Sequence, residues 1–499
     1  MDIRKLGMIG VGNMGGMLSL LFAEHGIEVH FFDPSDQHVD DLQEHARTAG
    51  LEGRINHHRD YQTLCESLDT PKVLVFSTPH GSVADKTISS LDPWLKPGDI
   101  IMDAGNEHWQ NTVRRQESLA PTGIHYIGMG VSGGYQSARS GPSLSPGGSK
   151  EALDVVFPFL QRVAARDAKG RPCTVKLGPG GSGHFVKMVH NGIEHGMMTG
   201  LCEVWGLMAQ HLSMSYEDIG NVFEEWNKNG PLQRNYLVDN GSRVCRAKDP
   251  RDGSHILANV RDKVVQDVDN SEGTGTWTLE EATRLHVPAP VIAAAHMLRI
   301  TSADAAKREA VPSLAKGVVN PERIQVDSVA KFTKKLETAT YACFLTAFIE
   351  GLHIISRADR ENGWGIDFAE MLQLWRGGCI IQSDFIVDVL EGVYQSEGCD
   401  RDNLMSHPTL ARELKGCFPA LKHVVLRALE ADGCVPVLAA ALQSLVCAGS
   451  EDLPTSFQEA QMDAFGAHMY DLKTERPGRP ETGGHHFEWM PARGPDEDD

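Results

Sequence analysis

The sequence predicts an α/β domain built on a doubly wound sheet, followed by a large all-α domain and an extended C-terminal tail. Two observations lead to this fold class. Short apolar segments alternate with helical stretches up to about residue 180, whereas helical periodicity dominates from His184 to about Gly449. A chain of 499 residues also exceeds the roughly 250–300 residues at which single cores stop growing. We therefore expect three parts, residues 1–180, 181–450 and 451–499.

Composition and charge narrow the classes of function. Lys and Arg total 47 and Asp and Glu total 67, so the formal net charge is −20. Such acidity argues against a general nucleic-acid partner and against an anionic membrane surface. No apolar run approaches about 18 residues, and no secretory segment opens the chain, so we expect a cytoplasmic protein. The ten Cys lack paired spacing and predict reduced, buried thiols rather than disulfides or a metal site.

The first strand, expected over Lys5–Gly10, leads into a glycine-rich turn and then into a helix from Met14 to Glu24. A second strand follows over Ile27–Asp33. A G-x-G-x-x-G turn between a strand and a helix is typical of a Rossmann-type dinucleotide-binding domain. Its glycines let the backbone approach a pyrophosphate at the helix N-terminus. The residues expected to bind the dinucleotide here are Gly10, Gly12, Asn13, Met14 and Gly15.

Asp33 ends the second strand and is expected to face the adenosine ribose. A carboxylate there accepts hydrogen bonds from the ribose hydroxyls and repels a 2′-phosphate. The next residues, Pro34 and Ser35, offer no cation to such a phosphate. The sequence therefore favours NAD over NADP. The alternative is that Asp33 only caps a turn with Pro34.

Three further strands are expected over Lys72–Thr78, Asp99–Asp103 and His125–Val131. Strands that alternate with helices indicate a parallel sheet whose carboxyl ends carry the site. The residues that follow these strands are therefore expected at the ligands: Ser77, Thr78 and Asn106 at the coenzyme, and Asn106, Ser132, Gly133 and Gly134 at the substrate. The Gly/Ser/Pro-rich run Ser140–Gly148 could be only a long loop, but next to Ser132-Gly-Gly it is expected to line the pocket.

The segment Gly183–Gly196 carries the candidate catalytic face. Read as a helix, it places Lys187, Asn191 and Glu194 at i, i+4 and i+7, with His190 beside Asn191. Such groups could exchange protons with a substrate and hold it. A solvated surface ion pair is the alternative. Apolar flanking residues and mid-helix glycines, which cost roughly 1 kcal/mol each relative to Ala, favour the functional interpretation.

Beyond Glu451 we expect one more helix, from about Phe457 to Leu472, and a tail from Glu475 to Asp499. The tail is rich in Pro, Gly and His and ends in acidic residues. Such terminal segments are usually disordered.

Several longer motifs carry a family resemblance. They are Asp103-Ala-Gly-Asn106, Gly130-Val-Ser-Gly-Gly134, Gly141-Pro-Ser-Leu-Ser-Pro-Gly-Gly148, Gly183–Glu194, Phe223-Glu-Glu-Trp-Asn227, Gly273-Thr-Gly275 with Trp277, Trp375-Arg-Gly-Gly-Cys379 and Phe465-Gly-Ala-His468. Along essentially the whole chain the sequence resembles the 6-phosphogluconate dehydrogenases of the decarboxylating type.

The resemblance implies a homodimer in which each subunit's tail reaches into its partner's site. It also implies metal-free oxidative decarboxylation of a β-hydroxy sugar acid with NAD or NADP. In that scheme Lys187 takes the hydroxyl proton and later acts as an acid, and Glu194 protonates the carbon that has lost CO2. The groups that would orient the substrate are Asn106, Ser132, Gly133, Gly134, His190 and Asn191.

The chain departs from the family where phosphates are recognised. Thr274, Arg299 and His468 remain at the distal phosphate, whereas the family's Tyr, Lys and Arg are replaced by His195, Glu272 and Met462. At the ribose, the usual Asn-Arg-Thr is Asp33-Pro-Ser.

Because Arg and Lys are the normal partners of a phosphate, these changes predict NAD preference and a non-phosphorylated or otherwise variant aldonate. The alternative is an ordinary NADP-dependent 6-phosphogluconate dehydrogenase in which His195, Arg299 and His468 still hold the phosphate. Two other readings are a non-decarboxylating β-hydroxy-acid dehydrogenase and a coenzyme-binding protein without turnover.

Overall fold

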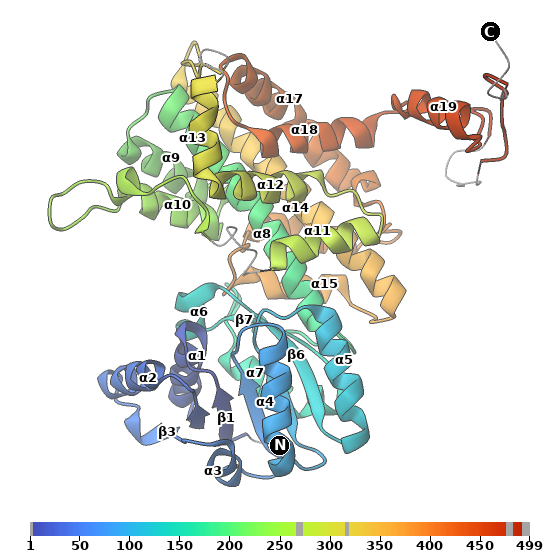
Figure 1. Cartoon of the computed structure of the whole chain (residues 1–499). Helices are drawn as coiled ribbons and strands as arrows, with labels where there is room; N and C mark the ends of the chain where they lie inside the picture. The colour runs from blue at the N-terminus through green and yellow to red at the C-terminus, as the bar shows by residue number, and fades with distance from the viewer. Residues whose placement is uncertain (1–2, 266–272, 315–318, 476–482, 492–499) are drawn as a thin grey trace. The chain divides into compact units, whose positions relative to one another are not determined.

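The computed structural model describes residues 3–265, 273–314, 319–475 and 483–491. The chain divides into two compact units, Met1–Ser444 and Leu445–Asp499, which are considered separately here (Figure 1). In the first unit the sheet occupies one end and the long helices the other (Figure 1). The expected order, an α/β domain before an all-α domain, is confirmed.

The sheet has seven strands in the order β3-β2-β1-β4-β5-β6-β7. The strands are β1 (Lys5–Ile9), β2 (Glu28–Phe32), β3 (Ile55–His57), β4 (Val73–Phe76), β5 (Ile100–Asp103), β6 (His125–Ser132) and β7 (Ser143–Gly147). All pairs are parallel except β6 with β7, which is antiparallel. The first six strands have the order of a doubly wound dinucleotide-binding sheet, whose crevice lies where the order reverses, between β1 and β4.

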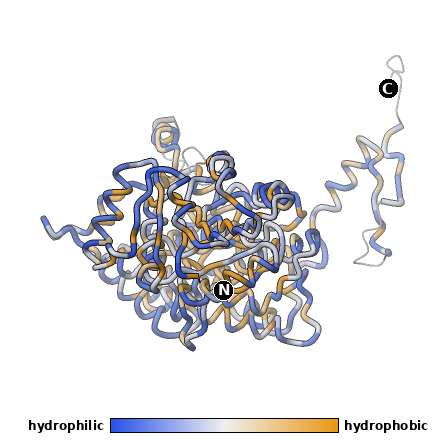
Figure 2. The backbone as a smooth tube through the Cα atoms, turned by 90° about the horizontal axis from the view of Figure 1, so that it is seen from below, coloured by the Kyte–Doolittle hydropathy of each residue, from blue (hydrophilic) through white to orange (hydrophobic). Residues whose placement is uncertain are grey.

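Side chains alternate across the strands and fill two cores. Leu6 and Met8 of β1 face one core, and Ile9 faces the other. The first core is covered by α1 (Asn13–Glu24), α2 (Asp36–Thr48), α6 (Gly134–Ser140) and α7 (Lys150–Val163). The second is covered by α3 (Tyr61–Glu66), α4 (Ser82–Leu91) and α5 (Trp109–Leu119). Figure 2 shows hydrophobic stretches of the chain gathered inside this unit.

The run Ser140–Gly148 contains β7, so the alternative of a simple long loop is wrong. Gly and Pro are depleted in strands, so its composition indicates a loop. In the fold, Pro146 lies on an edge strand, where a missing N–H is tolerated. The sheet is therefore mixed rather than all parallel. The three-residue strand β3 was also not predicted.

The all-helical part of the first unit is organised around α8 and α14, which pack against each other. Its helices are α8 (Ser182–Gly206), α9 (Tyr216–Lys228), α10 (Tyr236–Arg246), α11 (Thr274–Arg284), α12 (Pro290–Ala303), α13 (Ala305–Leu314), α14 (Val329–Asn362), α15 (Phe368–Met371), α16 (Asp384–Tyr394), α17 (Pro408–Glu430) and α18 (Pro436–Gly449). By length and composition α14 could cross a membrane, but 89% of its most apolar window is buried inside the protein. It is the core helix of this part.

Two buried carboxylates join the long helices to shorter ones. Glu203 of α8 accepts the N–H groups of Val437 (2.7 Å) and Leu438 (2.8 Å) at the start of α18. Glu350 of α14 accepts those of Val291 and Ile292 at the start of α12, at 3.1 Å. First-turn N–H groups have no partner within their own helix, so each carboxylate fixes a helix end.

The second unit is held together by Asp463 near the end of α19 (Thr455–Gly466). Its carboxylate accepts the N–H groups of Met469 (3.0 Å) and Phe487 (3.1 Å) and the indole N–H of Trp489 (2.8 Å). The helix ends six residues before the expected Leu472, because Ala467 and Met469 adopt left-handed backbone conformations.

The expectation of a disordered tail is wrong for residues 483–491. Besides the bonds to Asp463, His485 and Tyr470 exchange backbone hydrogen bonds of 2.8 and 3.0 Å. Residues 476–482 and 492–499 of the expected tail lie outside the described residues.

All ten cysteines are free, as expected, but not all are buried. Cys202, Cys434 and Cys447 are exposed. Cys202 and Cys447 lie on outward faces of α8 and α18, which a spacing argument does not reveal.

Candidate functional site

Helix α8 passes from the sheet into the helical part and is almost wholly buried. Its glycines make this passage possible. A Cβ on Gly183 would lie 2.1 Å from the backbone oxygen of Gly128, and one on Gly192 would lie 2.5 Å from Thr278 Cγ2. The close approach that the mid-helix glycines indicated is therefore made by neighbouring elements, here by α11 at Gly192.

The expected catalytic face forms within α8. Lys187 Nζ donates to Asn191 Oδ1 at 2.6 Å, and His190 Nδ1 lies 3.1 Å from the same oxygen. The Asn191 amide donates to Thr274 Oγ1 at 3.0 Å. Glu194 Oε2 lies 3.8 Å from His190 Nδ1. The structure thus brings Lys187, His190, Asn191, Glu194 and Thr274 together.

Lys187 lies against the sheet because Gly130 has no side chain. A Cβ at Gly130 would lie 2.3 Å from Lys187 Cβ. The lysine is 8% exposed, so it is shielded from bulk water at the carboxyl end of β6. A desolvated lysine loses its charge more readily than one in water, as proton exchange with a substrate requires.

Two buried histidines near Lys187 are neutral. Burial, together with the charge of Lys187, lowers the pKa of His190 well below its usual range. Burial and the nearby Arg299 lower the pKa of His195 to about 3. Among the described residues, neither His190 Nε2 nor His195 Nδ1 has a hydrogen-bond partner. Buried polar atoms of this kind call for a partner, which a substrate would supply.

The expected distal-phosphate residues in the first unit lie on α8, α11 and α12. His195 stacks on His296 of α12, with ring centroids 6.2 Å apart. A Cβ at Gly275 would lie 2.8 Å from each ring, so only glycine fits beside Thr274. Arg299 lies one turn beyond His296 and acts on the charge of His195.

The remaining phosphate positions are Glu272, Met462 and His468. Glu272 lies outside the described residues. Met462 and His468 belong to the second unit, where the His468 ring packs on Phe465 and would collide with a Cβ at Gly466.

Ser132 ends β6, Gly133 and Gly134 follow it directly, and Asn106 lies in the loop after β5. Gly133 and Gly134 have φ of 100° and 66°, a left-handed conformation that favours glycine. A Cβ at Gly133 would lie 2.4 Å from the backbone oxygen of Gly378. This turn therefore joins the sheet to the helical part next to the candidate catalytic face.

The glycine-rich turn fits a dinucleotide. Gly10 has φ of 87°, and a Cβ there would lie 2.4 Å from the backbone oxygen of Ser77. A Cβ at Gly15 would lie 2.0 Å from the backbone oxygen of Gly10. Gly12 caps α1 without a side-chain hydrogen bond, so the first N–H groups of the helix, at Asn13 and Met14, can receive an anion.

The carboxylate of Asp33 lies beside this turn, and the protein itself supplies hydrogen-bond partners for both of its oxygens. Its Oδ2 accepts the Val11 N–H at 2.7 Å, and its Oδ1 accepts the Ser35 N–H at 2.8 Å. His38 Nδ1 lies 3.2 Å from Oδ1, and the His38 ring lies 3.6 Å from the Cβ position of Gly12. Asp33 thus orders the turn, which is the turn-capping role weighed as an alternative.

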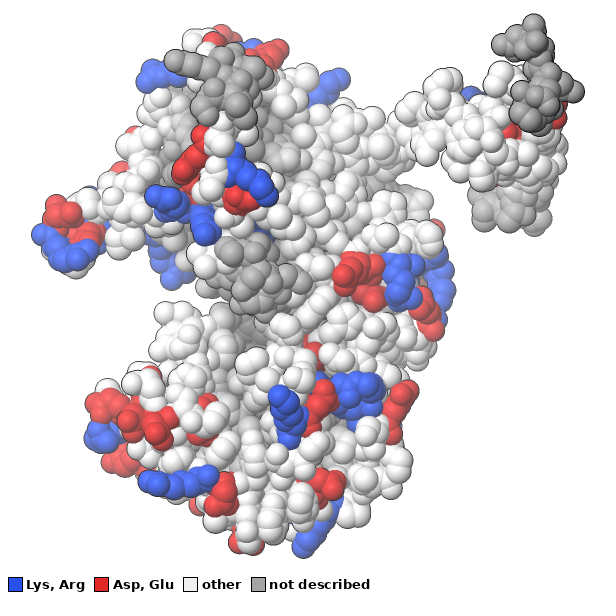
Figure 3. Space-filling view, viewed as in Figure 1, with Lys and Arg blue, Asp and Glu red and all other residues white. Residues whose placement is uncertain are grey.

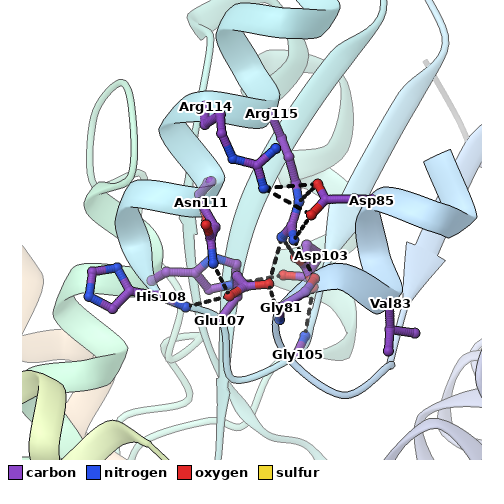
Figure 4. Close-up of polar contacts among 12 residues, drawn as sticks. Gly81, Val83, Asp85, Asp103, Gly105, Glu107, His108, Asn111, Arg114 and Arg115 are labelled. Carbon is purple, nitrogen blue, oxygen red and sulfur yellow. Dashed lines mark hydrogen bonds and ion pairs between the residues drawn. The ribbon is translucent and has the colours of Figure 1, made fainter. Parts of the chain in front are cut away.

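Sequence reasoning missed a buried ionic cluster behind the loops that follow β4 and β5 (Figure 4). Arg115, on α5, is 2% exposed and contacts Asp85, Asp103 and Glu107. Arg and Glu are almost never buried unless paired. A Glu just before a helix and an Arg within it indicate a solvated surface, so no sequence signal distinguishes this pair.

Family models describe the two parts of the chain. The NAD binding domain of 6-phosphogluconate dehydrogenase matches residues 5–178. The 6-phosphogluconate dehydrogenase C-terminal domain matches residues 183–489.

Individual relatives match along nearly the full length. A decarboxylating 6-phosphogluconate dehydrogenase of Emericella nidulans is 43% identical over 499 residues, covering 96% of this chain and 100% of the relative. An NADP(+)-dependent, decarboxylating 6-phosphogluconate dehydrogenase of Bacillus subtilis is 33% identical, covering 98% and 100%. The Plasmodium falciparum 6-phosphogluconate dehydrogenase, solved in apo form and with NADP+ or 6-phosphogluconate, has a TM-score of 0.87 at 29% identity, covering 97% of this chain and 100% of that one.

The resemblance stated from the motifs is confirmed by these matches. With its dinucleotide-binding sheet and the lysine-bearing helix α8, the chain belongs to the 6-phosphogluconate dehydrogenase family and is an NAD(P)-dependent oxidoreductase.

Proposed function

We propose that this protein catalyses the oxidative decarboxylation of 6-phosphogluconate to a ketose phosphate and CO2, with reduction of NAD(P). The observation that carries this proposal is the array of Lys187, Asn191 and Glu194 on α8, in a chain of this family. A metal ion is not needed, because Lys187 can supply the acid–base chemistry.

Lys187 accepts the proton of the hydroxyl on the substrate carbon that is oxidised to a ketone. A dinucleotide held at the Gly10–Gly15 turn would supply the hydride acceptor for that carbon. The bond to the carboxylate then breaks, and its electron pair forms an enediol as Lys187 returns the proton to the ketone oxygen. Glu194 protonates the carbon that lost CO2, and the enediol hydroxyl proton returns to Lys187 as the ketose forms.

The other expected site residues orient the substrate in this proposal. Asn191 holds Lys187 and, through its amide, Thr274. His190 is neutral and can donate or accept at Nε2, which lacks a partner among the described residues. Asn106 lies in the loop after β5, and the Ser132-Gly133-Gly134 turn ends β6, whose Gly130 packs on Lys187; these groups would bind hydroxyls and the carboxylate.

The names of the relatives favour 6-phosphogluconate, the alternative weighed from the sequence, over a non-phosphorylated aldonate. Thr274, His195 and Arg299 would receive the phosphate, with His468 from a partner subunit. The neutral His195 supports weaker phosphate binding than a cation would give. A variant aldonate thus remains a second proposal, carried by that observation.

For the coenzyme we propose that NAD is preferred. The carboxylate of Asp33 sits beside the turn that would hold the pyrophosphate, and Pro34 and Ser35 supply no cation. Helix α2 adds Asp36, Asp40, Asp41 and Glu44. Figure 3 shows acidic side chains gathered over this helix. A 2′-phosphate would meet unfavourable charge there.

We further propose a cytoplasmic homodimer with tail exchange. The second unit exposes large apolar side chains: Phe457 (70%), Phe465 (75%), Phe487 (56%) and Met490 (77%). Soluble monomers rarely expose contiguous apolar patches, so a partner surface that covers these groups supports the dimer.

The test is the initial rate of coenzyme reduction with 6-phosphogluconate and with gluconate, each with NAD and with NADP, while CO2 is trapped. Release of one CO2 per reduced coenzyme with 6-phosphogluconate supports the reaction. Turnover of gluconate alone contradicts the substrate, and coenzyme reduction without CO2 contradicts decarboxylation. A kcat/KM for NADP above that for NAD contradicts the coenzyme preference.

A further inference from the structure

Gly81 lies at the end of the loop after β4, and side chains hydrogen-bond both its backbone N–H and its carbonyl oxygen. Glu107 Oε2 accepts its N–H at 2.9 Å, and Arg115 donates to its carbonyl oxygen at 2.7 Å. Arg115 also donates to Glu107 at 2.6 Å, which closes the ring of contacts (Figure 4). Gly81 has φ of 83° and precedes α4, so this grip fixes a left-handed turn and the start of a helix.

Glu107 and Arg115, the two side chains that hold Gly81, are both ionised. Burial works to raise the pKa of Glu107, but hydrogen bonds from Asn111 and Arg115 outweigh it, and the pKa lies below its usual range. Arg115 faces three carboxylates, those of Asp85, Asp103 and Glu107. Buried ionic clusters contribute little net stability compared with apolar packing, so their value lies in fixing geometry.

The loops whose geometry is fixed in this way are those expected to contact the coenzyme and the substrate. Glu107 is buried and directly follows Asn106, which is exposed. A Cβ at Gly105 would lie 2.9 Å from the backbone oxygen of Thr78, so the loops after β4 and β5 touch. The hydrogen bond between Gly81 and Glu107 therefore fixes the position of Thr78 relative to that of Asn106.

The same two loops contact the helical part through Trp277. His80 and His108 meet the Trp277 ring edge to face, with centroid distances of 5.1 and 5.2 Å. Trp277 lies one turn after Thr274 on α11, and Thr274 accepts the Asn191 amide. The loops at the sheet are thus connected to the helix that carries Lys187.

We propose that Arg115 and Glu107 are positioning residues of the reaction. They clamp Gly81 and thereby fix the loops that carry Thr78 and Asn106. Together with the contacts of His80 and His108 with Trp277, these loops position the coenzyme side of the site relative to Lys187. The kinetic part rests on the proposed function, whereas the binding part requires only that the dinucleotide binds.

The experiment compares the full chain with Glu107→Gln and Arg115→Lys. The matched control is Arg114→Gln, because Arg114 also pairs with Asp85, at 2.9 Å, but is 55% exposed at its side chain and contacts neither Gly81 nor Glu107. Three quantities are measured: the Kd of NAD and of NADP by equilibrium titration, the Trp277 emission obtained by subtracting a Trp277→Phe variant, and kcat and KM for 6-phosphogluconate.

For both clamp variants we expect Kd to rise about tenfold and KM to rise severalfold, with a smaller change in kcat, since misplacing a binding group by about 1 Å weakens productive positioning. The Trp277 emission should shift to longer wavelength as its contacts loosen. Arg114→Gln should match the wild type in all three.

The inference is overturned if the clamp variants keep wild-type Kd and Trp277 emission, even when their melting temperature falls. It is also overturned if Arg114→Gln reproduces their effects. Should Glu107→Gln fail to fold, Arg115→Lys decides by the same criteria. Wild-type protein that binds dinucleotide but does not oxidise 6-phosphogluconate contradicts the proposed function and leaves the binding comparison valid.

Discussion

Lys187 Nζ donates a 2.6 Å hydrogen bond to Asn191 Oδ1, one helical turn further along α8. An amide oxygen orients the lysine without adding a negative charge. A carboxylate at the same place would instead stabilise the ammonium form. In the proposed reaction, this neutral partner would leave Lys187 able to exchange a proton with the substrate.

Asn191→Asp should abolish most activity with little change in shape. A carboxylate at 191 would hold Lys187 in its charged form, so we expect kcat to fall about 100-fold or more, the usual range for losing a general base. The acidic limb of the kcat profile should move to higher pH. Asn191→Ala removes the hydrogen bond without adding charge and should leave that limb in place. If the two variants show the same pH profile, charge at 191 is not what matters.

Restoring cations at the distal end should improve phosphate recognition. Glu272→Lys and Met462→Arg should each raise kcat/KM for 6-phosphogluconate about tenfold or more, since a hydrogen bond to a charged group contributes roughly 1.5–3 kcal/mol. The kcat/KM for gluconate is the control and should not rise. No gain with the phosphorylated acid would mean that its phosphate is bound elsewhere.

The sequence allowed five strands of the sheet, the glycine turn and the shared helix face of Lys187, Asn191 and Glu194 to be predicted, because each depends on local pattern. Lys187, Asn191 and Glu194 share a face because of helical spacing alone. Gly10 and Gly15 can be recognised because the tight turn between β1 and α1 requires glycine. Contacts between distant segments leave no such pattern. Arg115 meets Glu107 only after α5 packs on the sheet, and Asp463 contacts Phe487, which is 24 residues away in the sequence.

One strand was not predicted and one helix end was predicted too late, for physical reasons of the same kind. β7 is rich in Gly, Ser and Pro, yet it pairs with β6 because five consecutive residues find ladder partners there. α19 stops at Gly466 because the next residues turn back onto Asp463. Tertiary hydrogen bonds override composition in both cases.

The His30–His58 pair should make stability depend on pH. Burial lowers the pKa of both rings, and for His58 the neighbouring His30 adds to the effect; the two rings share a 2.9 Å contact. Below about pH 6.5 the unfolded chain therefore binds protons that the folded chain does not, so the free energy of unfolding falls as pH decreases. Above that pH the pair contributes no dependence.

Urea unfolding at about pH 7.5 and about pH 5.5 checks this for the wild type and for His58→Gln. The variant should lose less stability between the two conditions. His45→Gln, an exposed histidine on α2, is the control and should behave like the wild type. An equal loss in His58→Gln and the wild type would remove the pair from the explanation.

The ribose side gives a prediction about the coenzyme. Pro34→Arg in an Asp33→Asn background should raise kcat/KM for NADP relative to NAD by about tenfold or more, because a guanidinium replaces a carboxylate beside the 2′-phosphate. Some stability should be lost, since Asp33 also accepts the Val11 N–H. An unchanged ratio of kcat/KM for NADP to kcat/KM for NAD, with both coenzymes still used, would show that residues 33 and 34 do not determine the coenzyme preference.

Tail exchange can be decided by mixing two inactive subunits. Lys187→Ala destroys a site but leaves a normal tail, and His468→Ala leaves the site but removes the tail's phosphate contact. If His468 serves the partner's site, a mixed dimer contains one complete site, made of the Lys187 of one chain and the His468 of the other. Random pairing then gives about a quarter of the wild-type sites in a co-expressed sample. If each tail serves its own subunit, no complete site forms, and the mixture should be no more active than the average of the two parent variants at low substrate.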